Sequence, residues 1–187
     1  MKRNRLFTIF KKDDGAAVVE TAIVLPILIT VIAFVFEMGM YILLHSKLTR
    51  MAGVLTDTIT RQNLSSSTLR GLLNTADTIT FPFDFTRNGK IVVSQVRNSR
   101  QSNNAADMRI SWQENKGGGV SLIGQPGMTP QNLPNNIIVI QDQTIVVTEV
   151  FYQYTPLVFR DIFSVQSIYK TAVFVPRTGD MNALLSN

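Results

Sequence analysis

Hydrophobic positions divide the chain into a continuous apolar stretch near the N-terminus and a remainder with short apolar runs. Residues 16–36 read AAVVETAIVLPILITVIAFVF and contain one charged side chain, Glu20. At a helical rise of about 1.5 Å per residue, these 21 residues would span roughly 32 Å, the thickness of a bilayer's hydrocarbon core. The pattern therefore predicts a membrane-spanning helix.

Beyond this stretch, apolar residues recur at helical spacing. The repeating positions are Leu44, Leu48, Met51, Leu55 and Ile59, separated by four, three, four and four residues. Such spacing places the side chains on one face of a helix. One helix is therefore predicted from residue 16 to about residue 62, with the apolar face of its C-terminal part packed against a globular domain.

The rest of the chain favours a short helix followed by strands. Residues 65–68, Ser-Ser-Ser-Thr, can cap a helix that carries Leu69, Leu72, Leu73 and Ala76. Strands are predicted at 79–85, 91–96, 108–114, 137–140, 144–154 and 167–175, with hairpins at Asn88-Gly89 and at 141–143 and a long exposed loop at 124–136. This order predicts an α+β fold in which the long helix lies on an antiparallel sheet.

Charge sets the expected orientation. The basic residues Lys2, Arg3, Arg5, Lys11 and Lys12 precede the apolar stretch, which places the N-terminus in the cytoplasm and the C-terminal domain across the membrane. The formal charge of +5 falls to +2 over residues 16–187, where 13 basic and 11 acidic side chains remain. No nucleic-acid partner is predicted, because such a partner requires a stronger basic field.

Two other kinds of segment share features of this apolar stretch. A secretory signal peptide would end at a cleavage site with small residues after the apolar part, but residues 35–44 are dominated by large side chains. An uncleaved signal anchor explains the basic flank and the length equally well. It does not explain Glu20.

Glu20 has two interpretations on the residues alone. A charged group at the bilayer centre costs about 3 kcal/mol, whereas near the interface the positive end of the helix dipole would stabilise the carboxylate by about 0.3–1 kcal/mol. Alternatively, a cut after Gly15 would give Ala16 a free α-amino group. That cation could pair with Glu20 of a neighbouring subunit, since a buried carboxylate is tolerated when it is paired.

The run from Gly15 to Pro26, GAAVVETAIVLP, resembles the TadE/TadF-like minor pseudopilins of the Tad (tight adherence, or Flp) type IV pilus system. The matching positions are Gly15, Glu20, Ala22, Leu25, Pro26, Glu37 and Gly39, and the resemblance covers residues 15–62. Thr21 stands where these proteins commonly have Phe or Tyr. A weaker second resemblance covers residues 146–157, VVTEVFYQYTPL, a tyrosine-containing strand with a following proline.

The resemblance implies a pilin-like protein of three parts: a cytoplasmic leader at 1–15, a transmembrane and stalk helix at 16–62, and a periplasmic α+β domain at 63–187. It implies that a prepilin peptidase cuts between Gly15 and Ala16 and that Glu20 is an assembly residue. Pro26 would kink the helix, either in a specialised assembly role or as a simple kink of a membrane helix. The implied partners are the membrane, the peptidase, other pilins or pseudopilins and Tad assembly proteins. The implied location is the bacterial inner membrane. The resemblance also allows a second location, in which the protein is incorporated in an extracellular pilus.

Catalytic chemistry is not predicted. The acidic residues of the C-terminal part are scattered, the chain has one histidine and no cysteine, and Gly117-Gly118-Gly119 lacks the Lys-Ser/Thr of a phosphate loop. We therefore expect no enzyme activity, no metal and no cofactor. The alternative function is an unprocessed, membrane-anchored binding or adhesion module, which would retain residues 1–15.

Overall fold

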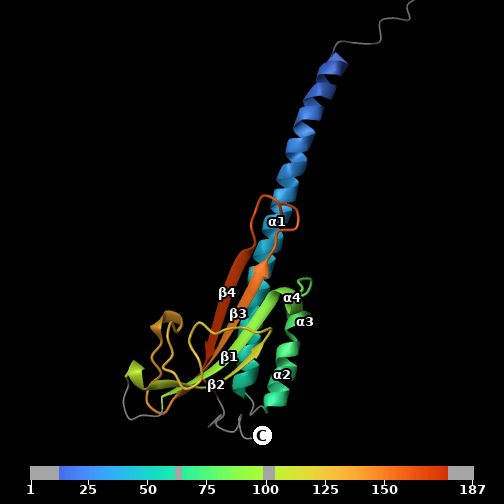
Figure 1. Cartoon of the computed structure of the whole chain (residues 1–187). Coiled ribbons are helices and arrows are strands. Elements are labelled where there is room, and N and C mark those ends of the chain that lie inside the picture. The colour runs from blue at the N-terminus through green and yellow to red at the C-terminus, as the bar shows by residue number, and fades with distance from the viewer. Residues whose placement is uncertain (1–12, 62–64, 99–103, 177–187) are drawn as a thin grey trace, which may run out of the picture.

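A computed structural model describes residues 13–61, 65–98 and 104–176, so most of the basic leader lies outside the described residues. The fold is α+β, as predicted. Helix α1 (Asp13–Arg61) runs from one end of the molecule to the other. Its N-terminal half projects alone, and its C-terminal half lies against one face of a four-stranded sheet (Figure 1).

The predicted stripe on α1 forms the centre of the main core. Leu44, Leu48, Met51, Leu55 and Ile59 are all fully buried, and α1 packs mainly on the last two strands of the sheet. Burying an apolar side chain of this size contributes about 1.5–3 kcal/mol. The stripe therefore fixes the helix to the sheet, and the predicted extent of the helix is confirmed.

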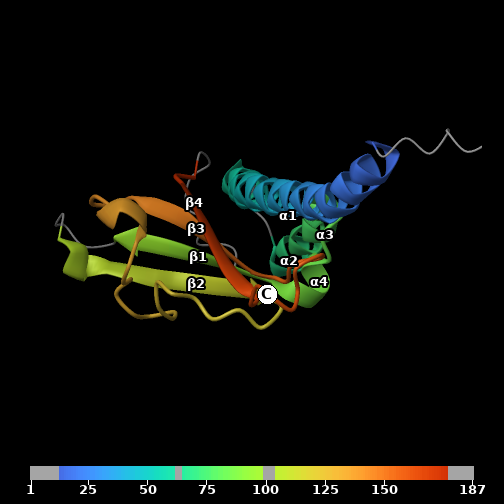
Figure 2. The ribbon, with the colours of Figure 1, turned by 90° about the horizontal axis from the view of Figure 1, so that it is seen from above.

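The sheet has the strand order β2-β1-β3-β4, and all three neighbouring pairs are antiparallel. Its strands are β1 (Gly89–Asn98), β2 (Met108–Lys116), β3 (Thr144–Tyr154) and β4 (Gln166–Phe174), with the 3₁₀ turn η1 (Ala105–Asp107) before β2. Seen from above, α1 covers one face of the sheet (Figure 2). The strands predicted at 91–96, 108–114, 144–154 and 167–175 are confirmed.

The other face of the sheet is covered by the long connection between β2 and β3. Ile123, Leu133 and Val139 of this connection are buried against Ile110 and Val147. The segment predicted as an exposed loop at 124–136, which includes the 3₁₀ turn η2 (Pro134–Asn136), therefore contributes to a second core.

The strand predicted at 137–140, and with it the hairpin at 141–143, is wrong. The backbone of Val139 forms hydrogen bonds with side chains and not with a neighbouring strand. Its carbonyl accepts from Asn98 Nδ2 at 3.0 Å, and its N–H donates to Met108 Sδ at 3.2 Å. The Val139 side chain points into the second core. Local apolar composition predicted a strand, but tertiary contacts decided the backbone conformation.

Short helices precede the sheet. Helix α2 (Ser66–Asn74) is capped as predicted, because the Ser65 hydroxyl accepts from Thr68 N at 3.3 Å. The strand predicted at 79–85 and the hairpin at Asn88-Gly89 are wrong: the chain forms α3 (Ala76–Thr80) and α4 (Phe85–Asn88), which leads directly into β1. Phe85 is fully buried, so the apolar composition serves core packing.

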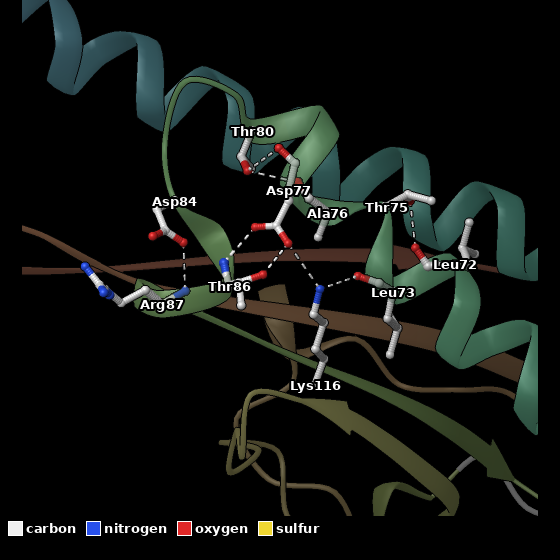
Figure 3. Close-up of polar contacts among 10 residues, drawn as sticks. All are labelled: Leu72, Leu73, Thr75, Ala76, Asp77, Thr80, Asp84, Thr86, Arg87 and Lys116. Carbon is white, nitrogen blue, oxygen red and sulfur yellow. Dashed lines mark hydrogen bonds and ion pairs between the residues drawn. The ribbon is translucent and has the colours of Figure 1, made fainter.

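Asp77 on α3 connects these helices (Figure 3). Its carboxylate accepts hydrogen bonds from the N–H of Thr86, at 2.7 Å, and from the Thr86 hydroxyl. Lys116 Nζ lies 3.5 Å from Asp77 Oδ2 and donates to the Leu73 carbonyl at 3.3 Å. Asp84 caps α4 by accepting from Arg87 N at 3.0 Å. Three short helices and β2 are thus joined by side-chain contacts that strand periodicity does not reveal.

Asp77 should make folding sensitive to acid. The hydrogen bonds from Thr86, with a further contribution from Lys116, hold the pKa of Asp77 below its ordinary value. Its stabilising contribution is therefore full above the unfolded-state pKa, about 3.9, and is lost as pH falls towards the lower folded-state pKa. In urea titrations, the stability advantage of the wild type over Asp77→Asn should shrink as pH falls from 6 to 3. A constant difference would contradict this role.

Candidate membrane-assembly segment

The N-terminal half of α1 presents apolar side chains on all sides. From Gly15 to Phe36 the residues are exposed, apart from the partly buried Ala33, and the helix is long and apolar enough to span a membrane. A helix that is apolar around its whole circumference requires lipid or other protein around it. The exposed segment fits a single-pass membrane protein.

The sequence-predicted site residues all lie on this exposed half. A Cβ added to Gly15 would meet no atom within 4 Å, so nothing in the described fold requires glycine there. Glu20 is exposed and has no hydrogen bond or ion pair with the residues that the structure describes. The structure therefore gives Glu20 no partner within the described part of this chain.

Polar and special residues in this half are accommodated by the helix itself. The Thr21 hydroxyl donates to the Ala17 carbonyl at 2.8 Å, which satisfies a polar group that would otherwise face lipid. The helix continues through Pro26 without interruption, and the Thr30 hydroxyl donates to the Pro26 carbonyl at 2.8 Å. This bond satisfies the Thr30 hydroxyl, whereas the backbone carbonyl that loses its helix partner because of Pro26 is that of Ala22, four residues earlier.

Glu37 is the functional candidate to which sequence analysis assigned no role. It was noted only as a motif position, yet its side chain is buried where the apolar half of α1 meets the sheet domain, with 6% of its surface exposed. Its carboxylate accepts from the N–H of Leu157, at 2.9 Å, from the N–H of Val158, at 2.8 Å, and from the Tyr154 hydroxyl. One carboxylate thus joins the helix to the end of β3 and to the loop that follows.

Aromatic side chains surround the Glu37 contact. The Tyr41 and Tyr154 rings lie 5.3 Å apart, and Phe34, one turn before Glu37, lies 6.3 Å from the Phe159 ring. Burial, together with the neighbouring Glu37 carboxylate, raises the pKa of Tyr154. Tyr154 therefore stays protonated and able to donate at any physiological pH.

A sequence signal for Glu37 existed. It lies seven residues before Leu44, two helical turns back along the same face, so it extends the buried stripe towards the membrane. A carboxylate on an apolar face requires partners. Spacing alone does not reveal these partners, because they come from residues 117 or more positions away in the chain.

A second buried carboxylate lies on the other face of the sheet. Glu149 on β3 is fully buried and accepts from Leu122 N and from the Tyr169 hydroxyl, both at 2.9 Å, and from the Ser121 hydroxyl. It fastens the start of the β2–β3 connection to the sheet. In the described ranges, no group of three or more His, Cys, Asp or Glu side chains is placed to hold a metal ion.

Comparison with known proteins gives a family match for the N-terminal segment. The family model of TadE-like proteins matches residues 15–53, whereas no curated protein and no solved structure matches the chain. The matched segment contains Gly15, Glu20, Pro26 and Glu37. It ends at residue 53, short of the predicted limit of 62, and does not include the second resemblance at 146–157. The match confirms the resemblance drawn from the motif: over residues 15–53, this chain is similar to TadE-like proteins.

Proposed function

We propose that this protein is a minor pseudopilin that helps to assemble or prime a Tad (Flp) type IV pilus. The observation that carries the proposal is a helix, similar to TadE-like proteins, whose exposed apolar half bears Glu20, a carboxylate without a partner among the described residues, and whose other half packs on a sheet domain. TadE-like proteins are structural and associated with the Tad pilus. The pilus and its assembly proteins are therefore the partners we infer.

In this proposal, the inner membrane holds residues 16–36 of α1, the N-terminus lies in the cytoplasm, and the domain of residues 63–187 lies in the periplasm. The positive leader supports this orientation. The exposure of Gly15 supports recognition from outside the chain, because no contact in the described fold uses it.

The proposed role of Glu20 follows from its position. Cleavage after Gly15 would create an α-amino group at Ala16, one helical turn from Glu20. In a bundle of such helices, the amine of one subunit pairs with Glu20 of the next. The pair replaces two separate charges in an apolar medium and thereby favours assembled over free subunits.

Processing is tested by intact mass. In cells that contain a prepilin peptidase, the wild-type chain extracted from membranes should lack residues 1–15, and Gly15→Leu should retain them because a large side chain blocks recognition at the cut. Gly39→Leu is the matched control: Gly39 is also an exposed glycine of α1 with no atom within 4 Å of an added Cβ. This variant should be processed like the wild type.

A wild-type chain that keeps residues 1–15 in those cells would contradict processing. It would favour the alternative function, an unprocessed membrane-anchored binding or adhesion module. The same result would remove the proposed pairing of Glu20 with Ala16, since no α-amino group would exist at that position.

A further inference from the structure

The loop between β3 and β4, residues 155–165, carries apolar side chains outward. Ile162 is 72% exposed, and Leu157, Val158, Phe163 and Val165 are each about half exposed. Exposed apolar patches of this kind mark surfaces that meet a partner or a membrane. No described part of the chain covers these side chains.

The loop lies beside the membrane half of α1. Figure 1 shows it beyond the end of the sheet, next to the helix. Its Phe159 contacts Phe34, which lies within the predicted membrane segment, and a mainly apolar groove of about 260 Å³ opens between the loop and the helix, lined in part by Phe34, Met38 and Phe163. The apolar surface of the loop is thus continuous with that of the spanning helix.

Several backbone N–H groups of the loop already have hydrogen-bond acceptors within the protein and do not need water. Leu157 and Val158 donate their N–H groups to Glu37, and Ile162 and Phe163 donate theirs to the Phe159 carbonyl at 3.0 and 2.9 Å. A backbone N–H group without a hydrogen-bond partner is strongly disfavoured at membrane depth, because lipid offers it no acceptor. Four N–H groups next to or within the most apolar residues are therefore already satisfied inside the protein.

We propose that the β3–β4 loop inserts its apolar side chains into the lipid interface beside α1, with Glu37 holding the loop at that depth. The insertion gives the protein a second membrane contact. It requires only that α1 spans a bilayer, and it does not depend on cleavage or on pilus assembly. The exposed charges Arg160 and Asp161 fit the headgroup region, where a long arginine side chain can reach lipid phosphates.

The position of the loop beside α1 favours lipid, and not a protein partner, as the medium that covers its apolar side chains. The loop is attached to the point where α1 leaves its apolar segment, so the bilayer that surrounds Phe34 also reaches Phe159. A loop that lies in the interface buries its apolar side chains to a depth of about 5–10 Å, while its polar groups stay near the headgroups. A second copy of the chain would need a complementary surface at the same height.

The test uses a spin label on the full chain in phosphatidylcholine–phosphatidylglycerol vesicles. Because the protein has no cysteine, Ile162→Cys gives one labelled site, and the exposed position spares the fold. Met128→Cys is the matched control, because Met128 is also an apolar loop residue and is 57% exposed. Its carbonyl accepts from the N–H of Ile110 on β2, which lies at the opposite edge of the sheet from β4.

Collisions of the label with a water-soluble nickel chelate should be several-fold rarer at residue 162 than at residue 128, and collisions with oxygen more frequent. Dilution of the protein with lipid should leave the difference unchanged. Equal nickel accessibility at the two sites would overturn the proposal. Protection of residue 162 that disappears on dilution would also overturn it, because it would assign the loop to a contact between protein copies.

Discussion

Under the proposed function, replacement of Glu20 by glutamine should abolish incorporation of this protein into the pilus while leaving its insertion in the membrane intact. Glutamine keeps the size of the side chain but removes the charge, so the helix enters the bilayer at no greater cost. The proposed partner, the α-amino group of a neighbouring Ala16, would then lose its counter-charge. Breaking a buried ion pair costs about 3–5 kcal/mol, which reduces association by roughly 10²- to 10⁴-fold.

The measurement is the amount of protein in sheared pili compared with the membrane fraction. Asp57→Asn is a suitable control, because Asp57 lies on the same helix and its carboxylate forms an ion pair with Arg61 at 2.9 Å at the surface. Loss of that pair should have little effect, since exposed pairs contribute about 0.2–1 kcal/mol. Normal amounts of the Glu20→Gln variant in pili would remove the proposed role.

Replacement of Glu37 by alanine should release the β3–β4 loop and destabilise the end of the sheet domain nearest the apolar half of α1. Two backbone N–H groups and the Tyr154 hydroxyl lose their acceptor at once. A hydrogen bond to a charged group contributes about 1.5–3 kcal/mol, and a buried donor left without a partner costs about 1–3 kcal/mol. We expect a loss of about 3–5 kcal/mol in the local stability of the loop.

Amide hydrogen exchange on the full chain measures this loss directly. In the alanine variant, residues 157 and 158 should exchange at least 100-fold faster, the rate change that corresponds to about 3 kcal/mol. The centre of β1 should be unchanged. Tyr154→Phe is the graded control, because it removes one donor and keeps both N–H contacts with Glu37. Its effect should be about 1–2 kcal/mol. Unchanged exchange at 157 and 158 in Glu37→Ala would show that the contact does not hold the loop.

The sequence predicted the parts of the fold that depend on local pattern. The helical stripe from Leu44 to Ile59 and the cap at Ser65 follow from spacing and hydrogen-bonding chemistry within a few residues, and both are confirmed. The strands with long β-branched runs, such as 144–154, were also predictable, because this composition suits a buried strand.

The errors arose where side chains distant in the sequence decide the backbone. Asp77 binds Thr86 across nine residues and thereby replaces a predicted strand by two short helices. Asn98 and Val139 are 41 residues apart, and their contact prevents a predicted strand at 137–140. Hydrophobicity alone cannot distinguish these outcomes, because the apolar residues are buried in either case.

The candidate site was also predictable only in part, because some of its contacts join residues that are distant in the sequence. The motif located Gly15, Glu20 and Pro26, all of which lie on the exposed half of α1. The motif also contained Glu37, but its partners lie more than 100 residues away, at the end of β3 and in the following loop. Their contact forms only when the sheet packs on the helix.

Because α1 is one helix from Asp13 to Arg61, the direction of Glu20 and the orientation of the sheet domain are not independent. Glu20 and Glu37 are 17 residues apart, and at about 100° per residue the two carboxylates point roughly 100° apart around the helix axis. A neighbour that binds Glu20 would therefore also determine which edge of the sheet turns towards it. The continuous helix thereby relates both the height and the rotation of a contact at Glu20 to those of the sheet domain.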